Sequence, residues 1–140
     1  MKTLLIALSV ILAGVSSFSY AGSPVSMSPA GASVYIISPT DGQTVGTTVT
    51  IQFGLTGMGV SPAGVEKAKT GHHHLLIDGN KLPDLTQPLG KDVMHFGGGQ
   101  TEKTIELSKG THTLQLILGN HLHIPHNPPV VSNKITITVK

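Results

Sequence analysis

The stretch Gly71-His72-His73-His74-Leu75-Leu76-Ile77-Asp78-Gly79 runs three consecutive histidines into an apolar segment that ends in an Asp-Gly turn signal. Successive side chains of an extended chain point to opposite faces, so we expect His72 and His74 to share one face. His73 then lies on the other face together with Leu75. Same-face residues lie about 6.5–7 Å apart along the backbone, so two long imidazoles can converge on one ion. The stretch therefore predicts a strand that carries metal ligands on one face.

The first residues of the chain are typical of a secretory signal peptide. Lys2 precedes an apolar run over residues 4–15, and small and polar residues follow up to Ser19-Tyr20-Ala21. The apolar run is short for a membrane span, although an uncleaved anchor stays the open alternative. We predict that residues 1–21 are a signal peptide and that the mature chain begins at Gly22. The protein is then periplasmic or secreted, with no stable membrane insertion after cleavage.

The composition of the mature chain excludes several classes of function. Removing residues 1–21 from the 140-residue chain leaves 119 residues, which suits one domain. Eight lysines, no arginine and seven acidic residues remain, and this near balance argues against nucleic acid as a partner. The absence of cysteine excludes disulfides, thiolate metal sites and cysteine nucleophiles. Histidine is in excess, and all eight histidines lie between His72 and His126.

The rest of the sequence is typical of an all-β domain. Residues 22–32 are rich in Pro, Gly and Ser and are predicted to form a flexible leader. Short segments then alternate apolar and polar residues or are rich in β-branched residues, and none has helix periodicity: residues 34–37, 48–55, 72–78, 101–107, 111–118 and 135–139. We predict that residues 33–140 fold into an antiparallel immunoglobulin-like β-sandwich of about seven strands.

The same alternation predicts the core and one strand pairing. Residues 101–107 and 111–118 flank the turn residues Ser108-Lys109-Gly110, so we expect these two segments to form a hairpin. Three alternating rows are expected to fill the space between the two sheets: Val49, Ile51 and Phe53; Leu114, Leu116 and Leu118; Ile135, Ile137 and Val139.

Two further places carry potential metal ligands. One is His121-Leu122-His123-Ile124-Pro125-His126, and the other is Met94-His95. Neutral imidazole suits copper, zinc and nickel, whereas thioether sulfur favours Cu(I). The candidate metal ligands are therefore His72, His74, Met94, His95, His121, His123 and His126.

Other polar residues are given supporting roles. Asp78 and Asp92 are predicted to accept hydrogen bonds from ligand rings. His73 is expected to make a structural hydrogen bond, and His112 to pack or cap near the start of its strand.

The sequence argues against several kinds of site. A type-1 copper site needs a thiolate, and a zinc protease of the common kind needs a His-Glu-x-x-His helix. A nucleophilic serine of the common hydrolase kind lies in a Gly-x-Ser-x-Gly context, and no serine here does. A histidine-brace site needs an N-terminal histidine, whereas the predicted mature chain begins at Gly22. We predict no catalytic residues and no enzymatic activity.

Four motifs together resemble a family of small exported bacterial domains of unknown function. They are Gly71-His-His-His-Leu-Leu-Ile-Asp78, His95-Phe-Gly-Gly-Gly-Gln-Thr-Glu102, Gly110-Thr-His-Thr-Leu-Gln-Leu116 and His123-Ile-Pro-His-Asn-Pro-Pro-Val-Val-Ser132. The resemblance implies a compact β-sandwich. Some members occur in copper-handling settings, which implies copper rather than zinc. Many relatives carry Asp where this chain has Asn120 or Asn127.

The sequence predicts a periplasmic metal-binding protein that stores, buffers or delivers copper through a histidine cluster, with zinc as the alternative metal. A periplasmic metal-accepting protein is the expected partner. Two other functions stay open: an interaction module of the cell envelope with structural or pH-responsive histidines, and a metal-dependent enzyme with an open coordination position. The metal prediction requires the histidine-bearing segments to meet in the folded chain.

Overall fold

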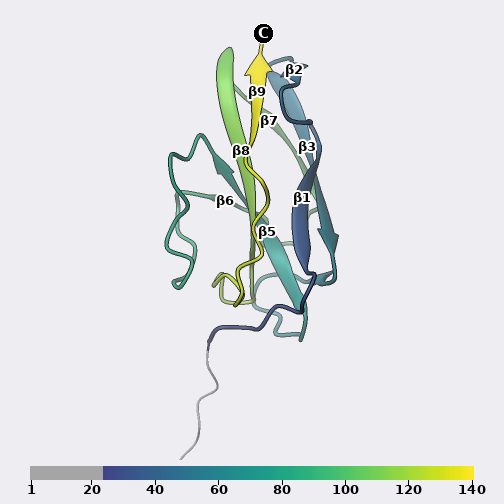
Figure 1. Cartoon of the computed structure of the whole chain (residues 1–140), viewed down its shortest axis with the longest axis vertical. Helices are drawn as coiled ribbons and strands as arrows, with labels where there is room; N and C mark the ends of the chain where they lie inside the picture. The colour runs from purple at the N-terminus through teal and green to yellow at the C-terminus, as the bar shows by residue number, and fades with distance from the viewer. Residues whose placement is uncertain (1–23) are drawn as a thin grey trace, which may run out of the picture.

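The computed structural model of the chain describes residues 24–140, and the predicted signal peptide lies outside them (Figure 1). The described residues form strands and no helix, so the all-β prediction is confirmed. Residues 24–140 contain nine strands rather than about seven: β1 (Ser33–Ser38), β2 (Thr44–Val45), β3 (Thr48–Thr56), β4 (Gly59–Val60), β5 (Thr70–Ile77), β6 (Met94–His95), β7 (Glu102–Glu106), β8 (Gly110–Gly119) and β9 (Ile135–Val139). Nowhere in residues 24–140 is there a helix long and apolar enough to cross a membrane.

The strands form two sheets that lie in two layers (Figure 1). One sheet has the order β1-β3-β7, and its pairs are antiparallel. The other has the order β2-β9-β8-β5-β4, with β6 paired to β5. This second sheet is mixed rather than purely antiparallel, because β2 runs parallel to β9 and β4 runs parallel to β5.

A hydrophobic core fills the space between the two layers. The three predicted rows lie in it, and only Ile135 among them is partly rather than fully buried. Each fully buried side chain of this kind contributes roughly 1.5–3 kcal/mol to the free energy of unfolding. The buried members are Val34, Val49, Ile51, Phe53 and Ile105 from the first sheet, Leu75, Leu114, Leu116, Leu118, Ile137 and Val139 from the second, and Phe96 and Val130 from loops.

The predicted hairpin between residues 101–107 and 111–118 is wrong. Strand β7 pairs with β3, with Ile105 opposite Val49, whereas β8 lies in the other sheet between β5 and β9. The turn after β7 therefore carries the chain from one sheet to the other. The physical reason is that an alternating strand buries one face in either case, so Ile105 and Leu114 can meet across the core as readily as within one sheet.

The outer face of the second sheet is also covered. A second apolar cluster consists of Leu76, Val93 and Ile117, and leucines of the connection between β5 and β6 pack against it. The backbone N–H of Leu89 in that connection donates to the carbonyl of His123 at 2.9 Å, which joins the connection to the loop after β8. Strand β5 is consequently buried on both faces, and its three histidines are buried with it.

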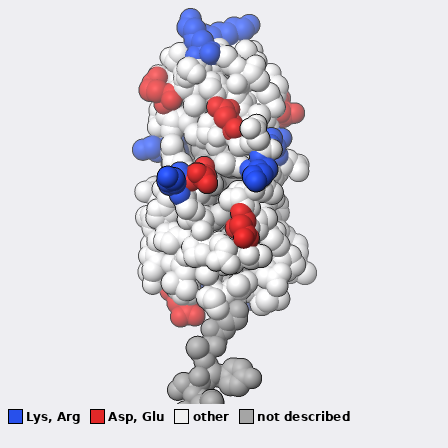
Figure 2. Space-filling model, turned by 90° about the vertical axis from the view of Figure 1, so that its left-hand side faces the viewer, with Lys and Arg blue, Asp and Glu red and all other residues white. Residues whose placement is uncertain are grey.

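The charged side chains form no extended basic surface on the face shown in Figure 2. Acidic and basic residues are interspersed over the middle of the molecule there. A nucleic-acid-binding face would instead gather positively charged lysines into a stripe or patch.

Part of the predicted leader contacts the domain. Met27 forms an isolated parallel bridge with Asn127, and Ser28 donates hydrogen bonds to the carbonyls of Asn127 and Pro128 at 3.1 and 2.6 Å. Residues 24–28 thus lie against the loop that follows β8.

The packing predicts a contrast between two leucines. Leu116 is 0% exposed in the core between the sheets, whereas Leu122 is 45% exposed. We expect Leu116→Ala to lower the free energy of unfolding by about 2–5 kcal/mol, because it leaves a cavity. Leu122→Ala is the matched control and should change it by less than about 0.5 kcal/mol. Urea unfolding measures both, and equal losses would contradict the two-layer core.

Candidate metal centre

Four histidines from three separate segments meet on the outer face of the second sheet. His72 and His74 come from β5, His95 from β6 and His123 from the loop after β8. One ring nitrogen of each lies within 4.8 Å of those of the others. The structure thus brings together the three places that the sequence singled out.

The strand pairing explains why these rings meet. Alternation along β5 places His72 and His74 on the outer face, as predicted, while Leu75 enters the core. His95 is the direct antiparallel partner of His74 in the β5–β6 pair. Gly119, the last residue of β8, pairs with His72, and the chain then turns tightly so that His123 returns to the same place.

The distances between ring nitrogens suit one metal ion. His72 Nε2 lies 3.1 Å from His123 Nδ1 and 3.2 Å from His95 Nε2. Four imidazole nitrogens arranged tetrahedrally at the zinc–nitrogen distance would lie about 3.3 Å from one another. The two separations from His72 are close to this value, and all four ligand atoms lie within 4.8 Å of one another, so the rings would have to draw closer around an ion.

Several buried ring nitrogens have no hydrogen-bond partner. His72 Nδ1 and both ring nitrogens of His74 are in this condition, and the two side chains are 0% and 1% exposed. A buried polar atom without a partner costs about 1–3 kcal/mol, so native proteins rarely leave one. An ion bound by His74 would give that ring the partner it lacks.

The environment keeps the rings neutral. Burial, followed by the neighbouring rings of His123 and His95, lowers the pKa of His72 to about 4. Burial, followed by the other three rings, lowers the pKa of His74 to about 3. Burial and then His95 also lower the pKa of His123. Neutral imidazole is the form that binds metal, so these rings are ready to coordinate at neutral pH.

The cluster is closed on one side and open on the other. His72 and His74 are buried by the sheet and its covering loops, whereas His123 is half-buried and His95 is exposed. An ion could therefore reach the buried pair past His95. No carboxylate belongs to this group of ligand atoms within residues 24–140.

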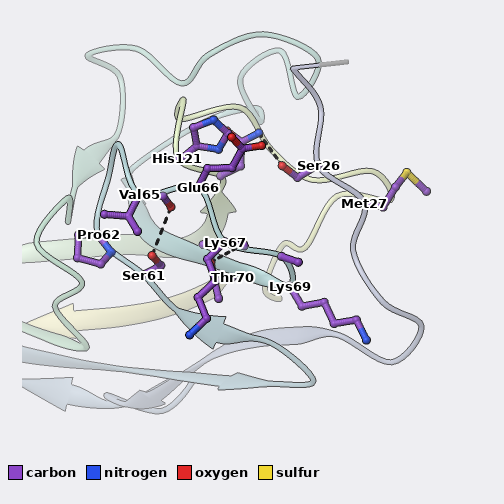
Figure 3. Close-up of a pocket in the computed structure, with 13 residues that line it drawn as sticks. Ser26, Met27, Ser61, Pro62, Val65, Glu66, Lys67, Lys69, Thr70 and His121 are labelled. Carbon is purple, nitrogen blue, oxygen red and sulfur yellow. Dashed lines mark hydrogen bonds between the residues drawn. The ribbon is translucent and has the colours of Figure 1, made fainter. Parts of the chain in front are cut away.

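Three predicted ligands lie elsewhere. Met94 is opposite Leu75 in the β5–β6 pair and packs against the hydrophobic core. His121 lines a pocket of about 360 Å³ that also contains Ser26 and Glu66 (Figure 3). His126 is buried, with its Nε2 3.1 Å from the Thr70 carbonyl and its Nδ1 3.4 Å from that of Leu118, so it links strands β5 and β8.

The predicted role of Asp78 as an acceptor for ligand rings is wrong. Its carboxylate accepts from His112 Nδ1 at 2.7 Å and from the Thr113 N–H at 2.8 Å. His112 Nε2 donates to the Ser108 carbonyl at 2.8 Å, and the hydrogen bond with Asp78 raises the pKa of His112. Because His112 Nε2 is hydrogen-bonded to the Ser108 carbonyl, it is not free to accept a proton from the Ser108 hydroxyl, which lies 3.4 Å away. His112 thus caps the Ser108 carbonyl, which agrees with the prediction that it packs or caps near the start of its strand.

The remaining supporting residues also differ from expectation. Neither ring nitrogen of His73 has a hydrogen-bond partner, and the ring packs 5.2 Å from that of Phe53 in the core. Burial lowers the pKa of His73. No hydrogen bond links Asp92 to the histidine cluster in the described part of the chain; Asp92 lies exposed within the connection between β5 and β6.

Sequence reasoning missed the residue that shapes the loop of His123. The side-chain oxygen of Asn120 accepts from the N–H groups of Leu122 and Ile124 at 2.9 and 3.0 Å. Its amide nitrogen donates to the Pro24 carbonyl at 2.8 Å, which also fixes the start of the described chain. An asparagine directly after a strand and before a loop rich in proline is a known turn signal, and it could have indicated this role.

The lowered pKa values predict acid sensitivity of the metal-free protein. The folded values of about 4 for His72 and about 3 for His74 lie below the 6.5 of an unfolded chain. Their contribution is therefore complete above pH 6.5 and is lost as pH falls toward 3–4, because unfolding then takes up protons. Between pH 6 and 4.5 we expect the free energy of unfolding to fall by about 1.4 kcal/mol per pH unit for each such histidine.

Urea unfolding with a chelator present measures this slope. His74→Leu should reduce the slope, whereas His121→Ala, which changes a histidine outside the cluster, should leave it unchanged. A stability that is independent of pH over this range would contradict the burial of neutral rings.

Comparison with known proteins identifies a family but no individual relative. Neither the curated proteins nor the solved structures contain a match to this chain. The family model described as "Domain of unknown function (DUF4399)" matches residues 51–140, a range that includes all four clustered histidines. The chain therefore belongs to this family of domains of unknown function.

Proposed function

We propose that this protein is a periplasmic metal-binding protein that stores, buffers or delivers copper through His72, His74, His95 and His123. One observation carries the proposal. Ring nitrogens from three segments distant in sequence lie within 4.8 Å of one another, around buried nitrogens that have no hydrogen-bond partner. A metal ion at this point would give one nitrogen of the buried His74 ring the partner that it lacks.

The chemistry of the donors favours copper over zinc. Imidazole binds both metals, and for a given nitrogen site Cu²⁺ binds more tightly than Zn²⁺. Imidazole ligands bring no negative charge and no carboxylate joins them within residues 24–140, so a bound ion would keep its full charge. The cost of burying an ion rises with its charge, which favours Cu(I) over a divalent ion. The resemblance to domains from copper-handling settings points the same way, and zinc is the alternative.

The openness of the site supports transfer rather than catalysis. The exposed His95 is the ligand that an incoming donor or acceptor protein would replace first. Within residues 24–140 no carboxylate joins the ligand group, where it could act as a general base beside the metal. The proposed partner is a periplasmic metal-accepting protein, and the signal-peptide pattern of residues 1–21 supports export.

We also propose that the domain is an immunoglobulin-like sandwich. The supporting observation is the strand order. Immunoglobulin domains of the constant type place strands A, B, E and D in one sheet and C, F and G in the other, and the first sheet here has three of those four. Here β1, β3 and β7 form one sheet, while β5, β8 and β9 are neighbours in the other, which corresponds to that division.

Titration of the metal-free, untagged protein tests the function. We expect about one Cu(I) or Cu(II) ion per chain to bind more tightly than micromolar, and Zn(II) to bind more weakly. His72→Ala/His74→Ala should abolish this binding. His95→Ala, which changes an exposed ring and should fold normally, should weaken it. His121→Ala is the matched control and should bind like the wild type.

Two results would overturn the proposal. One is an affinity of the wild-type chain no tighter than micromolar for every metal tested. The other is an equal loss of metal affinity in His95→Ala and His121→Ala, because each histidine would then bind metal independently rather than as part of one cluster. Elemental analysis of untagged protein purified from the periplasm identifies the metal carried in the cell, and zinc alone would replace copper in the proposal.

A further inference from the structure

Two glycines lie against rings of the histidine cluster. A Cβ atom added at Gly97 would lie 2.3 Å from His95 Cε1 and 2.6 Å from His95 Nε2. A Cβ added at Gly119 would lie 2.7 Å from His74 Cε1 and 3.1 Å from its Nδ1. Neither glycine has the positive φ that would itself require glycine. Space for the rings, rather than backbone conformation, is what these two positions provide.

We infer that Gly97 is a positioning residue of the metal site, whose missing side chain lets the His95 ring turn into the cluster. The inference rests on the proposed function. Its geometric basis is that the ring nitrogen of His95 that faces the cluster is also an atom that a side chain at position 97 would strike. His95 Nε2 lies 3.2 Å from His72 Nε2, and the same atom would meet the added Cβ.

The two glycines differ in what a substitution would do. His74 is 1% exposed and has no room to move, so a methyl group at Gly119 must disturb the sheet around it. His95 is exposed, and its side chain can swing outward. Alanine at Gly97 therefore withdraws one donor from the cluster while the imidazole itself, the fold and the other three donors stay. Gly97 can be tested without a large loss of stability, and Gly119 cannot.

A matched control lies in the neighbouring connection. A Cβ added at Gly90 would have no heavy atom within 4 Å, and Gly90 does not have a positive φ. Gly90→Ala thus makes the same chemical change as Gly97→Ala, with no ring to displace.

The experiment compares copper affinity among Gly97→Ala, His95→Ala, the double variant that combines them, and Gly90→Ala. Gly97→Ala should weaken copper binding about 10- to 100-fold, the range typical of residues that orient a ligand. His95→Ala, which removes the ligand itself, should weaken it at least as much. The double variant should bind no more weakly than His95→Ala alone, because Gly97 acts through that ring. Gly90→Ala should bind like the wild type, and urea unfolding should give similar midpoints for all four.

An affinity of Gly97→Ala equal to that of the wild type overturns the inference, as does a further loss in the double variant. A second readout needs no metal. In the metal-free protein, nuclear Overhauser contacts between the His95 and His72 rings should be present in the wild type and absent in Gly97→Ala. If the wild-type chain binds no metal, the proposed function fails, while these ring contacts still decide whether Gly97 positions His95.

Discussion

The two-residue period of β5, buried between two apolar layers, is the constraint on which the site depends. It sends His73 and Leu75 into the core between the sheets and sends His72 and His74 to the opposite face. That outer face would meet water in a simple two-layered domain. Here the connection between β5 and β6 and the loop after β8 cover it. Polar rings are consequently held in an apolar setting, where their unpaired nitrogens have few alternatives to a ligand.

The backbone around the cluster carries a second sign of constraint. His123 adopts a left-handed conformation with φ of 65°, which is uncommon for a residue other than glycine. Such residues cost of order 1–3 kcal/mol and persist where surrounding contacts hold them. The Asn120 side chain, which binds two N–H groups of this turn, supplies such contacts. Strain at the residue whose ring completes the cluster is what one expects where position matters more than local stability.

Local patterns predicted what depends on one strand at a time. The faces of β5 and the buried rows around Ile51, Leu116 and Ile137 followed from alternation alone. Pairing between strands did not, because β7 buries Ile105 equally well beside β8 or opposite it. The loop after β8 offered three histidines with no period to rank them. His123 enters the cluster because of a turn that Asn120 shapes, which is visible only once its hydrogen bonds are known.

The cluster combines two kinds of donor, and this combination bears on what the site can do. His72 and His74 are fixed by a central strand and have no freedom to follow an ion. His95 is exposed at the end of a two-residue strand, and His123 is half-buried in a turn. A site whose four ligands were all rigid would release a bound ion slowly. Two buried and two more accessible rings would permit stepwise exchange, in which the outer pair releases an ion while the inner pair still holds it. That division of roles suits the proposed delivery of copper better than it suits a purely structural metal site.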